Sequence, residues 1–188
     1  LHYQIDSNFL PDGWKRYMAR AVKDTYKKPV INAGNYRDPA VVEEALASGD
    51  VDIVGIGRGL IADPEWVKKV EHDETDILRK CISCNVGCAG NRIGINRPIR
   101  CTVNPAVPEG DIYKRLRVNK NCNVVVIGGV TAGLEAACTA AEVGCNVFLF
   151  EKSDKLGGLS EFISDLPSKT RMKDFPRYLR TRAERLPN

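Results

Sequence analysis

Three cysteines lie close together in the sequence, and a fourth follows after a gap. Cys81, Cys84 and Cys88 have the spacing C-x2-C-x3-C, and twelve residues separate the third cysteine from Cys101. Tight turns between closely spaced thiols let them point into one small volume, and a returning fourth thiol completes a tetrahedral set. The sequence therefore predicts a metal site made of four thiolates.

The asymmetric arrangement of three cysteines plus one favours a cubane 4Fe-4S cluster. Structural zinc is an alternative, although zinc ribbons typically use two separated C-x2-C pairs or mixed Cys/His sets. A third alternative is a set of reduced thiols or a disulfide framework. The seven cysteines are an odd number and no signal peptide is present, which argues against disulfides and for a reducing, cytoplasmic location.

Composition sets broad limits on size and partners. The 188 residues are 43% hydrophobic and 28% charged, which is enough for one core or two small ones. No apolar run is long enough to span a bilayer. The net charge of +4 is modest and the Lys and Arg residues are spread along the chain. We therefore expect neither a membrane nor a nucleic-acid partner.

The first part of the sequence alternates predicted helices with predicted strands. Residues 28–34 and 51–57 predict short buried strands that end in glycine, and capped helices begin at Asp38-Pro39 and Asp63-Pro64. A helix ending near residue 26 is predicted before them from an apolar face made of Trp14, Tyr17, Met18, Ala21 and Val22. This alternation predicts a parallel α/β fold.

Both predicted strands lead into residues suited to binding phosphate. Glycines such as Gly34 and Gly57 allow backbone N–H groups to approach a ligand, and the guanidinium of Arg58 matches the geometry of phosphate. In a (β/α)8 barrel, the loops after the last two strands form a phosphate site. The alternative is that the glycines only permit tight turns and that Arg58 is solvated.

The cysteine motif is followed by segments without helical or strand periodicity. Residues 89–98 are rich in glycine and asparagine and predict a loop that wraps the metal site. Residues 104–110 resemble a linker, and the basic run at 114–120 predicts a solvated connector.

The last third has the pattern of a nucleotide-binding βαβ unit. A strand at 123–127 leads into a glycine turn that contains Gly128 and Gly133, a helix runs from 134 to 143, and a second strand ends before Glu151. The glycines permit a tight turn, the helix N-terminus faces phosphate, and the acid suits a ribose diol. The alternative is a helix packed on strands with no ligand.

One residue departs from this fingerprint. In the G-x-G-x-x-G pattern that starts at Gly128, Val130 occupies the second glycine position, where a side chain would intrude on a pyrophosphate. The fingerprint is therefore predicted to bind a nucleotide less well than the full motif.

Together these motifs resemble the multidomain NADH:flavin oxidoreductases, which include 2,4-dienoyl-CoA reductase, trimethylamine dehydrogenase and the clostridial bile-acid-inducible enoate reductases. The resemblance covers nearly the whole chain. It is carried by residues 29–34, 55–64 and 101–107, by the cysteine motif and by the fingerprint at 124–158. Residues 87–90 and 96–101 look most similar to the bile-acid and steroid enoate branch.

The resemblance implies a division into four segments. Residues 1–78 would form the last two strands of an FMN-binding (β/α)8 barrel, and 79–110 a 4Fe-4S cluster loop. Residues 111–121 would be a linker, and 122–188 the first βαβ half of a Rossmann-like FAD/NAD(P)-binding domain. The chain would then be a middle piece of a longer protein, and it contains no assignable catalytic acid.

The resemblance also implies roles for individual residues. Gly34, Gly57 and Arg58 would hold the FMN phosphate, and the four cysteines would hold the cluster. The FAD pyrophosphate, ribose and ADP region would contact Gly128, Ala132, Gly133, Glu151, Lys152 and Gly158. Leu159 replaces a glutamine that such proteins usually have, a second departure from the pattern.

The implied activity is reduction of an activated C=C bond in an unsaturated acid, thioester or enone. Electrons would pass from NAD(P)H through FAD and the cluster to FMN, and a homo-oligomer would form through the barrel. An amine dehydrogenase of the same family is one alternative. A non-catalytic interaction module with a zinc-stapled linker is another.

Overall fold

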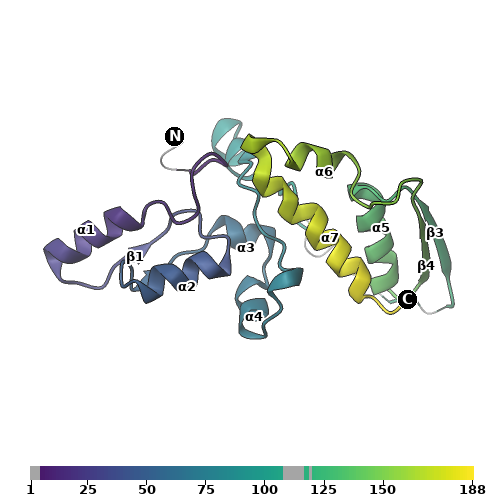
Figure 1. The fold of residues 1–188 in the computed structure, drawn as a ribbon, viewed down its shortest axis with the longest axis horizontal. Coiled ribbons are helices and arrows are strands. Elements are labelled where there is room, and N and C mark those ends of the chain that lie inside the picture. The colour runs from purple at the N-terminus through teal and green to yellow at the C-terminus, as the bar shows by residue number, and fades with distance from the viewer. Residues whose placement is uncertain (1–4, 108–116, 119) are drawn as a thin grey trace. The chain divides into compact units, whose positions relative to one another are not determined.

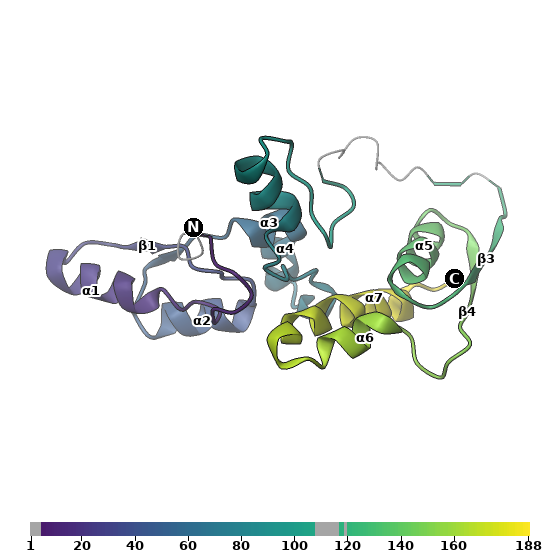
Figure 2. The ribbon, with the colours of Figure 1, turned by 90° about the horizontal axis from the view of Figure 1, so that it is seen from above.

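The computed structural model describes residues 5–107, 117–118 and 120–188. The chain divides into two compact units, Leu1–Pro108 and Glu109–Asn188 (Figures 1 and 2). Most of the predicted linker at 111–121 and of the basic run at 114–120 lies outside the described residues. The predicted boundaries at 78/79 and 121/122 stay predictions. Among the described helices, none has the length and apolar character needed to cross a bilayer.

The first unit is built from two parallel strands and short helices (Figure 1). β1 (Ile31–Asn32) pairs in parallel with β2 (Ile53–Val54), with Ile31 opposite Ile53. The helical elements of this unit are α1 (Arg16–Tyr26), α2 (Pro39–Ala47), α3 (Arg58–Ala62), α4 (Trp66–Glu71), the 3-10 helix η1 (Thr75–Ile77) and the π-helix η2 (Val86–Gly94). The predicted parallel α/β arrangement is confirmed.

Helix α2 begins at the predicted signal. The carboxylate of Asp38 accepts a hydrogen bond from the Ala40 N–H at 3.2 Å, and Pro39 occupies the first helical position. Both features stabilise a helix start because they suit N–H groups that have no partner in the helix. The helix ends at Ala47, Ser48 is its C-cap, and Gly49 follows with a φ of +71°.

Helix α4 starts later than the sequence predicts. Asp63 was expected to cap it, but the helix begins at Trp66. The carboxylate of Asp63 instead accepts from the Glu65 N–H and from Lys69 Nζ, at 3.1 and 2.7 Å. These bonds close the turn that leads into the helix. The short helix α3, for which the sequence analysis made no prediction, precedes this turn.

The core of the first unit lies between its strands and helices. Its buried members are Ala19, Tyr36, Val42, Ala45, Val51, Trp66 and Leu78. Helix α1 ends at Tyr26 as predicted, but its predicted apolar face is not part of the core, because Tyr17 and Val22 are exposed and Ala19 is the buried residue of that helix. The strands were also predicted to be buried, but Ile31 and Ile53 are 67% and 53% exposed. One face of this short sheet therefore has no cover among the described residues.

The first part of the segment between the cysteines is helical, so the prediction of an irregular loop at 89–98 is wrong for residues 89–94, whereas residues 95–98 form neither helix nor strand. Residues Val86–Gly94 form the π-helix η2, in which the Gly90 N–H donates to the Asn85 carbonyl five residues earlier at 2.7 Å. Asn85 precedes this helix with a φ of +59°. A π-helix is rare and is frequently found at functional sites, and this one lies between Cys84 and Cys101 and carries Cys88.

The second unit contains a parallel βαβ unit followed by helices. β3 (Asn123–Ile127) pairs in parallel with β4 (Asn146–Phe150) over five residue pairs, and α5 (Thr131–Glu142) connects them. Gly144, with a φ of +105°, follows α5. The remaining elements are α6 (Leu159–Ser164), the 3-10 helix η3 (Pro167–Lys173) and α7 (Asp174–Arg185).

Helices α5 and α7 lie side by side (Figures 1 and 2). Leu134 and Leu179 are fully buried between them, and Tyr178 is 6% exposed. The guanidinium of Arg182 lies in the same interface, 2.8 Å from Glu135 and 2.5 Å from Glu142. Because a buried charge needs partners, these two carboxylates allow Arg182 to be buried.

Candidate functional site

All four cysteines of the predicted metal site line one small cavity. The cavity lies between the segment that carries Cys81 and Cys84, the helix η2 that carries Cys88, and the segment that carries Cys101. All four are free thiols. The spacing of the cysteines in the sequence therefore brings the four sulfurs around a common space.

The segment with the first two cysteines is fixed to the residues that follow β1. Lys80 Nζ lies 2.7 Å from the carboxylate of Asp38. The guanidinium of Arg37 donates to the Cys81 carbonyl at 3.2 Å, and the Ser83 hydroxyl donates to Asn35 Oδ1 at 2.7 Å. These three contacts, made by residues 80–83, fix the position of this segment relative to the residues that follow β1.

The segment with the fourth cysteine is fixed by Asn104, which is 2% exposed. Its amide donates to the Ile61 carbonyl at 3.0 Å, and its Oδ1 accepts from Arg79 at 2.9 Å. Because buried amides are costly unless they are hydrogen-bonded, these contacts fix one position for the chain next to Cys101.

A backbone contact at Gly87 joins helix η2, which carries Cys88, to the segment that carries Cys101. The Gly87 carbonyl accepts from the Arg100 N–H at 2.7 Å. A Cβ at Gly87 would lie 2.6 Å from the Arg100 carbonyl oxygen, so only glycine fits. Because Gly87 and Arg100 each adjoin a cysteine, this close backbone contact sets the approach of Cys88 to Cys101.

Hydrogen-bond donors face several of the sulfurs. The Ser83 N–H donates to Cys81 Sγ at 3.3 Å, and the Thr102 hydroxyl lies 3.2 Å from Cys84 Sγ. Burial raises the pKa of the Cys81 thiol, and the Ser83 N–H and the nearby Arg58 oppose the rise. Burial also raises the pKa of Cys101, against the N–H groups of Val103 and Asn104. Metal binding here must therefore release protons from thiols.

The arrangement of the sulfurs bears on the type of metal site. In the part of the chain that the structure describes, no three His, Cys, Asp or Glu side chains are placed to hold a single metal ion. A tetrahedral zinc site needs four sulfurs about 2.3 Å from one atom. A cubane carries one thiolate on each of four irons, and the four free cysteines that line this cavity could supply them. The residues present therefore fit a cluster.

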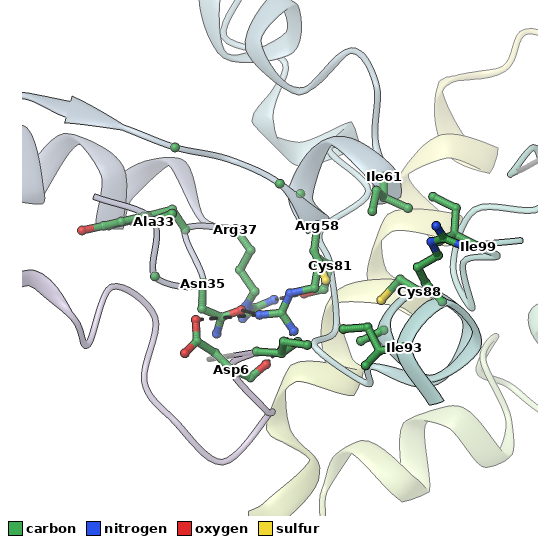
Figure 3. A pocket seen from close by; sticks show the side chains of 18 residues that line it. Asp6, Ala33, Asn35, Arg37, Arg58, Ile61, Cys81, Cys88, Ile93 and Ile99 are labelled. Atoms are coloured by element: carbon green, nitrogen blue, oxygen red, sulfur yellow. Dashed lines mark hydrogen bonds and ion pairs between the residues drawn. The ribbon is translucent and has the colours of Figure 1, made fainter. Parts of the chain in front are cut away.

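A larger pocket of about 370 Å³ lies beside the cysteine cavity (Figure 3). Its wall includes the three residues that the sequence analysis assigned to phosphate, Gly34, Gly57 and Arg58. Cys81 and Cys88 line this pocket as well as the cysteine cavity, and so do Arg58 and Ile61. The two spaces therefore share one wall, and two of the four cysteines belong to it.

Arg58 is not solvated, which excludes the alternative that it is an ordinary surface residue. Its side chain is 18% exposed. The guanidinium donates to the Asp6 carbonyl at 2.5 Å and to Asn35 Oδ1 at 3.1 Å, two residues that line the pocket with it (Figure 3). It also donates to Asn85 Oδ1 at 2.5 Å. Arg58 thus connects the pocket with the segment that carries the cysteines.

Sequence reasoning missed the partners of Arg58. Asp6, which is 4% exposed, accepts from Trp14 Nε1 at 2.8 Å and forms an ion pair with Lys15 at 3.0 Å. Asn35 and Asn85 both have positive φ values, a region in which asparagine is enriched over most residues. The sequence signal that could have indicated these partners is the position of the two asparagines, since Asn35 follows Gly34 and Asn85 lies within the cysteine motif.

In the second unit, the glycine turn has the close contacts that the fingerprint predicts. Gly128 has a φ of +102°. A Cβ at Gly133 would collide with the Gly128 carbonyl oxygen, and a Cβ at Gly129 would lie 3.0 Å from that of Glu151. The turn therefore requires glycine at these positions whether or not a ligand is bound.

Glu151 closes this turn, a role that the sequence analysis did not predict. Its carboxylate accepts from the Gly129 N–H at 2.6 Å, from the Ser153 N–H at 3.0 Å and from the Ser153 hydroxyl at 2.9 Å. These bonds, with Gly129 contributing most, lower the pKa of Glu151 to about 2. The carboxylate is thus held charged at the end of β4.

Glu151→Gln should weaken the fold above pH 5 and have little effect near pH 2. The carboxylate has a lower pKa in the folded chain than in the unfolded chain, so its stabilising effect is present above pH about 4.5 and is lost as the pH falls towards about 2. The measurement is the difference in melting temperature between the original chain and the variant from pH 7 to pH 2. A difference that does not shrink on acidification would contradict this role.

The other predicted nucleotide-binding residues are open to solvent. Ala132, Lys152 and Gly158 are exposed. Val130 Cγ2 lies 2.8 Å from the position that a Cβ on Gly158 would take, so the valine side chain contacts Gly158. Leu159 is 66% exposed. The binding roles of these residues stay predictions.

Comparisons with known proteins agree with the two units. Residues 6–76 match the model of the NADH:flavin oxidoreductase / NADH oxidase family, and residues 123–162 match that of the FAD dependent oxidoreductases. An NADH oxidase of Thermoanaerobacter brockii is 44% identical over 184 residues, which are 96% of this chain and 28% of the relative. A cinnamate reductase of Clostridium sporogenes is 38% identical over 137 residues, 73% of this chain and 20% of the relative.

Solved structures give the same result. A 2-naphthoyl-CoA reductase, in complex with 2-naphthoyl-CoA, superposes with a TM-score of 0.91 at 30% identity, over 96% of this chain and 28% of that chain. The chain thus spans less than a third of the length of each of these relatives. The chain belongs to the NADH:flavin oxidoreductase family.

Proposed function

We propose that this chain is part of a longer flavin and iron–sulfur oxidoreductase that reduces an activated C=C bond. When bound, NAD(P)H and the flavins FAD and FMN would supply hydride transfer, and the 4Fe-4S cluster between the flavins would supply one-electron transfer. The observation that carries the proposal is the wall that the cysteine cavity shares with the adjacent pocket, because Cys81 and Cys88 face both spaces.

In this proposal, the first unit supplies the end of an FMN-binding barrel and the cluster segment. Residues 1–78 would contribute the last two barrel strands, and 79–110 the cluster segment. The volume of the pocket, about 370 Å³, is in the range of small-molecule sites. The hydrogen bonds of Arg58 to Asp6, Asn35 and Asn85 use three of its five N–H groups, so its fork can also donate to a phosphate.

The second unit would hold FAD with the first half of a Rossmann-like domain, residues 122–188. Its parallel βαβ unit and its glycine turn support this proposal. Gly128, Gly133 and Ala132 would face the pyrophosphate, while Glu151, Lys152 and Gly158 would face the ribose and ADP region. Two of the hydrogen bonds that Glu151 accepts fall on Oε1 and one falls on Oε2, so Oε2 would accept a further hydrogen bond from a ribose hydroxyl.

The four cysteines would hold the cluster as thiolates, and donors around them would stabilise negative charge. The Thr102 hydroxyl beside Cys84 Sγ is suited to this because it is a side-chain donor that substitution can remove. Reduction adds negative charge to a cluster, so each hydrogen bond to a sulfur favours the reduced form.

Thr102→Val should lower the reduction potential of the reconstituted cluster. Loss of one hydroxyl donor should shift the one-electron equilibrium three- to tenfold, or by about 30 to 60 mV. The measurement is a redox titration followed by electron paramagnetic resonance. Thr102→Ser is the matched control, because it keeps the hydroxyl and should keep the potential. Equal potentials for the valine and serine variants would show that the hydroxyl does not face the cluster.

The relay is tested by removing one cysteine from the shared wall in the complete protein that contains this chain. Cys88→Ala should abolish NADH-dependent reduction of a 2-enoate such as cinnamate. The same variant should keep NADH-dependent reduction of ferricyanide, which needs only the nucleotide-binding flavin. Full alkene reduction without Cys88 would contradict the proposal.

The substrate class proposed is a small unsaturated acid, thioester or enone. The relatives reported above do not favour the alternative of an amine dehydrogenase. Within the described part of the chain, no contact favours a non-catalytic zinc module. A homo-oligomer through the barrel and a cytoplasmic location remain predictions.

A further inference from the structure

Two cysteines outside the cluster segment stand at neighbouring positions of the second unit. Asn123 is the partner of Asn146 in the parallel ladder, so Cys122 and Cys145 each precede a paired residue by one position. The Asn146 N–H donates to the Cys122 carbonyl at 2.8 Å, which shows that the ladder continues to these residues. Neighbouring strands lie about 4.8 Å apart, within the Cα separations of about 4.4 to 6.8 Å that disulfides span.

Both side chains lie on the same side of the sheet. Along β3 and β4, exposure alternates, and Cys122 and Cys145 fall in phase with the less exposed residues Val124, Val126, Val147 and Leu149. Successive side chains of a strand point to opposite faces, so the two thiols point to one face. The Cys145 thiol hydrogen-bonds that of Cys122, which raises the pKa of Cys145.

The two thiols differ in access to solvent. Cys145 is 4% exposed, whereas Cys122 is only partly buried. The backbone of Cys145 is fixed because its N–H donates to the Ala140 carbonyl at 3.1 Å, and the side-chain amide of Asn188 donates to its carbonyl. A small oxidant can therefore reach Cys122, and Cys145 lies beside it with a fixed backbone position.

We propose that Cys122 and Cys145 form a reversible dithiol–disulfide site in the second unit. The oxidant would be hydrogen peroxide. The Cys122 thiolate attacks one peroxide oxygen, the O–O bond breaks, and the products are a sulfenic acid on Cys122 and hydroxide. The Cys145 thiolate, once its proton has passed to that hydroxide, attacks the Cys122 sulfur, the S–O bond breaks, and hydroxide leaves as the disulfide forms. The two thiols lose two electrons, and peroxide gains them.

The disulfide would tie β3 to β4 at the ends away from the glycine turn. Gly128 and Glu151 follow the carboxyl ends of the two strands, while the cysteines precede the amino ends. The site is therefore separate from the proposed nucleotide contacts, and it can be present whether or not FAD binds there. In a reducing compartment such a bond is transient, as in redox-sensing proteins.

The test is peptide mapping of the whole chain after treatment with hydrogen peroxide, alkylation of free thiols and cleavage after glutamate. Cleavage at Glu135, Glu142 and Glu151 puts Cys122, Cys138 and Cys145 in three different peptides. Peptides 110–135 and 143–151 should then be recovered joined, with the mass of two hydrogens lost, and dithiothreitol should separate them. The cluster cysteines fall in another peptide and do not interfere.

Cys138 is the matched internal control, because it is 1% exposed and its thiol donates to the Leu179 carbonyl. It should stay alkylatable after unfolding in every sample. Cys122→Ser should abolish the joined peptide while circular dichroism shows an unchanged fold. Recovery of Cys122 and Cys145 as separate alkylated or overoxidised peptides, or linkage of either one to Cys138, would overturn the proposal.

Discussion

Gly87→Ala is expected to lower the iron content of the reconstituted chain at least tenfold. The added methyl group would lie 2.6 Å from the Arg100 carbonyl oxygen and 2.8 Å from its carbon. Both are backbone atoms, so no side-chain rotation can relieve the contact, and overpacking of this kind typically costs about 1–3 kcal/mol or displaces the backbone. Displacement would separate Cys88 from Cys101. Iron and acid-labile sulfide per chain are the quantities to measure.

Gly94→Ala is the matched control, since it makes the same change in the same π-helix. Nothing lies within 4 Å of a Cβ at Gly94, so this variant should assemble the cluster as the original chain does. Thermal melting of both variants shows whether the fold survives. An equal loss of iron in both variants would mean that η2 tolerates no substitution, and normal iron in Gly87→Ala would refute the role of the Gly87–Arg100 contact.

Arg58→Ala is expected to weaken FMN binding by the complete protein about 10- to 150-fold. A hydrogen bond to a charged group contributes about 1.5–3 kcal/mol, and each 1.4 kcal/mol is a factor of ten in affinity. Arg58 also holds Asn85 at 2.5 Å, so the variant should lose part of its iron as well. Flavin fluorescence titration gives the dissociation constant, and iron analysis gives the second effect.

Arg58→Lys separates charge from geometry. A lysine keeps the positive charge but lacks the planar fork, so it should restore only part of the FMN affinity. Arg20→Ala removes the same charge from an exposed position on α1, where Arg20 pairs with Asp24, and should leave FMN binding unchanged. If Arg58→Ala binds FMN as tightly as the Arg20 variant, Arg58 has a structural role only.

Elements with local signals were predictable from the sequence. Asp38-Pro39 gives the start of α2, and the glycines around α5 give the βαβ unit, because caps and turns depend on a few adjacent residues. The four cysteines were predictable for a similar reason, since short spacing forces three of them together. Their common cavity agrees with that prediction, although the bound metal remains a proposal.

Features that depend on distant residues were not predictable. Arg58 meets Asp6 and Asn85, which are 52 and 27 positions away, and no periodicity reports such contacts. The π-helix η2 has no sequence period of its own, so a glycine-rich segment was predicted to be a loop. The predicted burial of both strands was also wrong, because the apolar character of Ile31 and Ile53 does not show which parts of the chain cover them.

The central claim is that Cys81, Cys84, Cys88 and Cys101 hold a 4Fe-4S cluster beside the pocket. The most direct test is metal analysis of the chain after purification and reconstitution without oxygen, combined with visible absorption. The account predicts about four irons and about four sulfides per chain with broad absorption near 400 nm, all lost in the Cys88→Ala variant. Stoichiometric zinc, with no iron and no visible absorption, would contradict it.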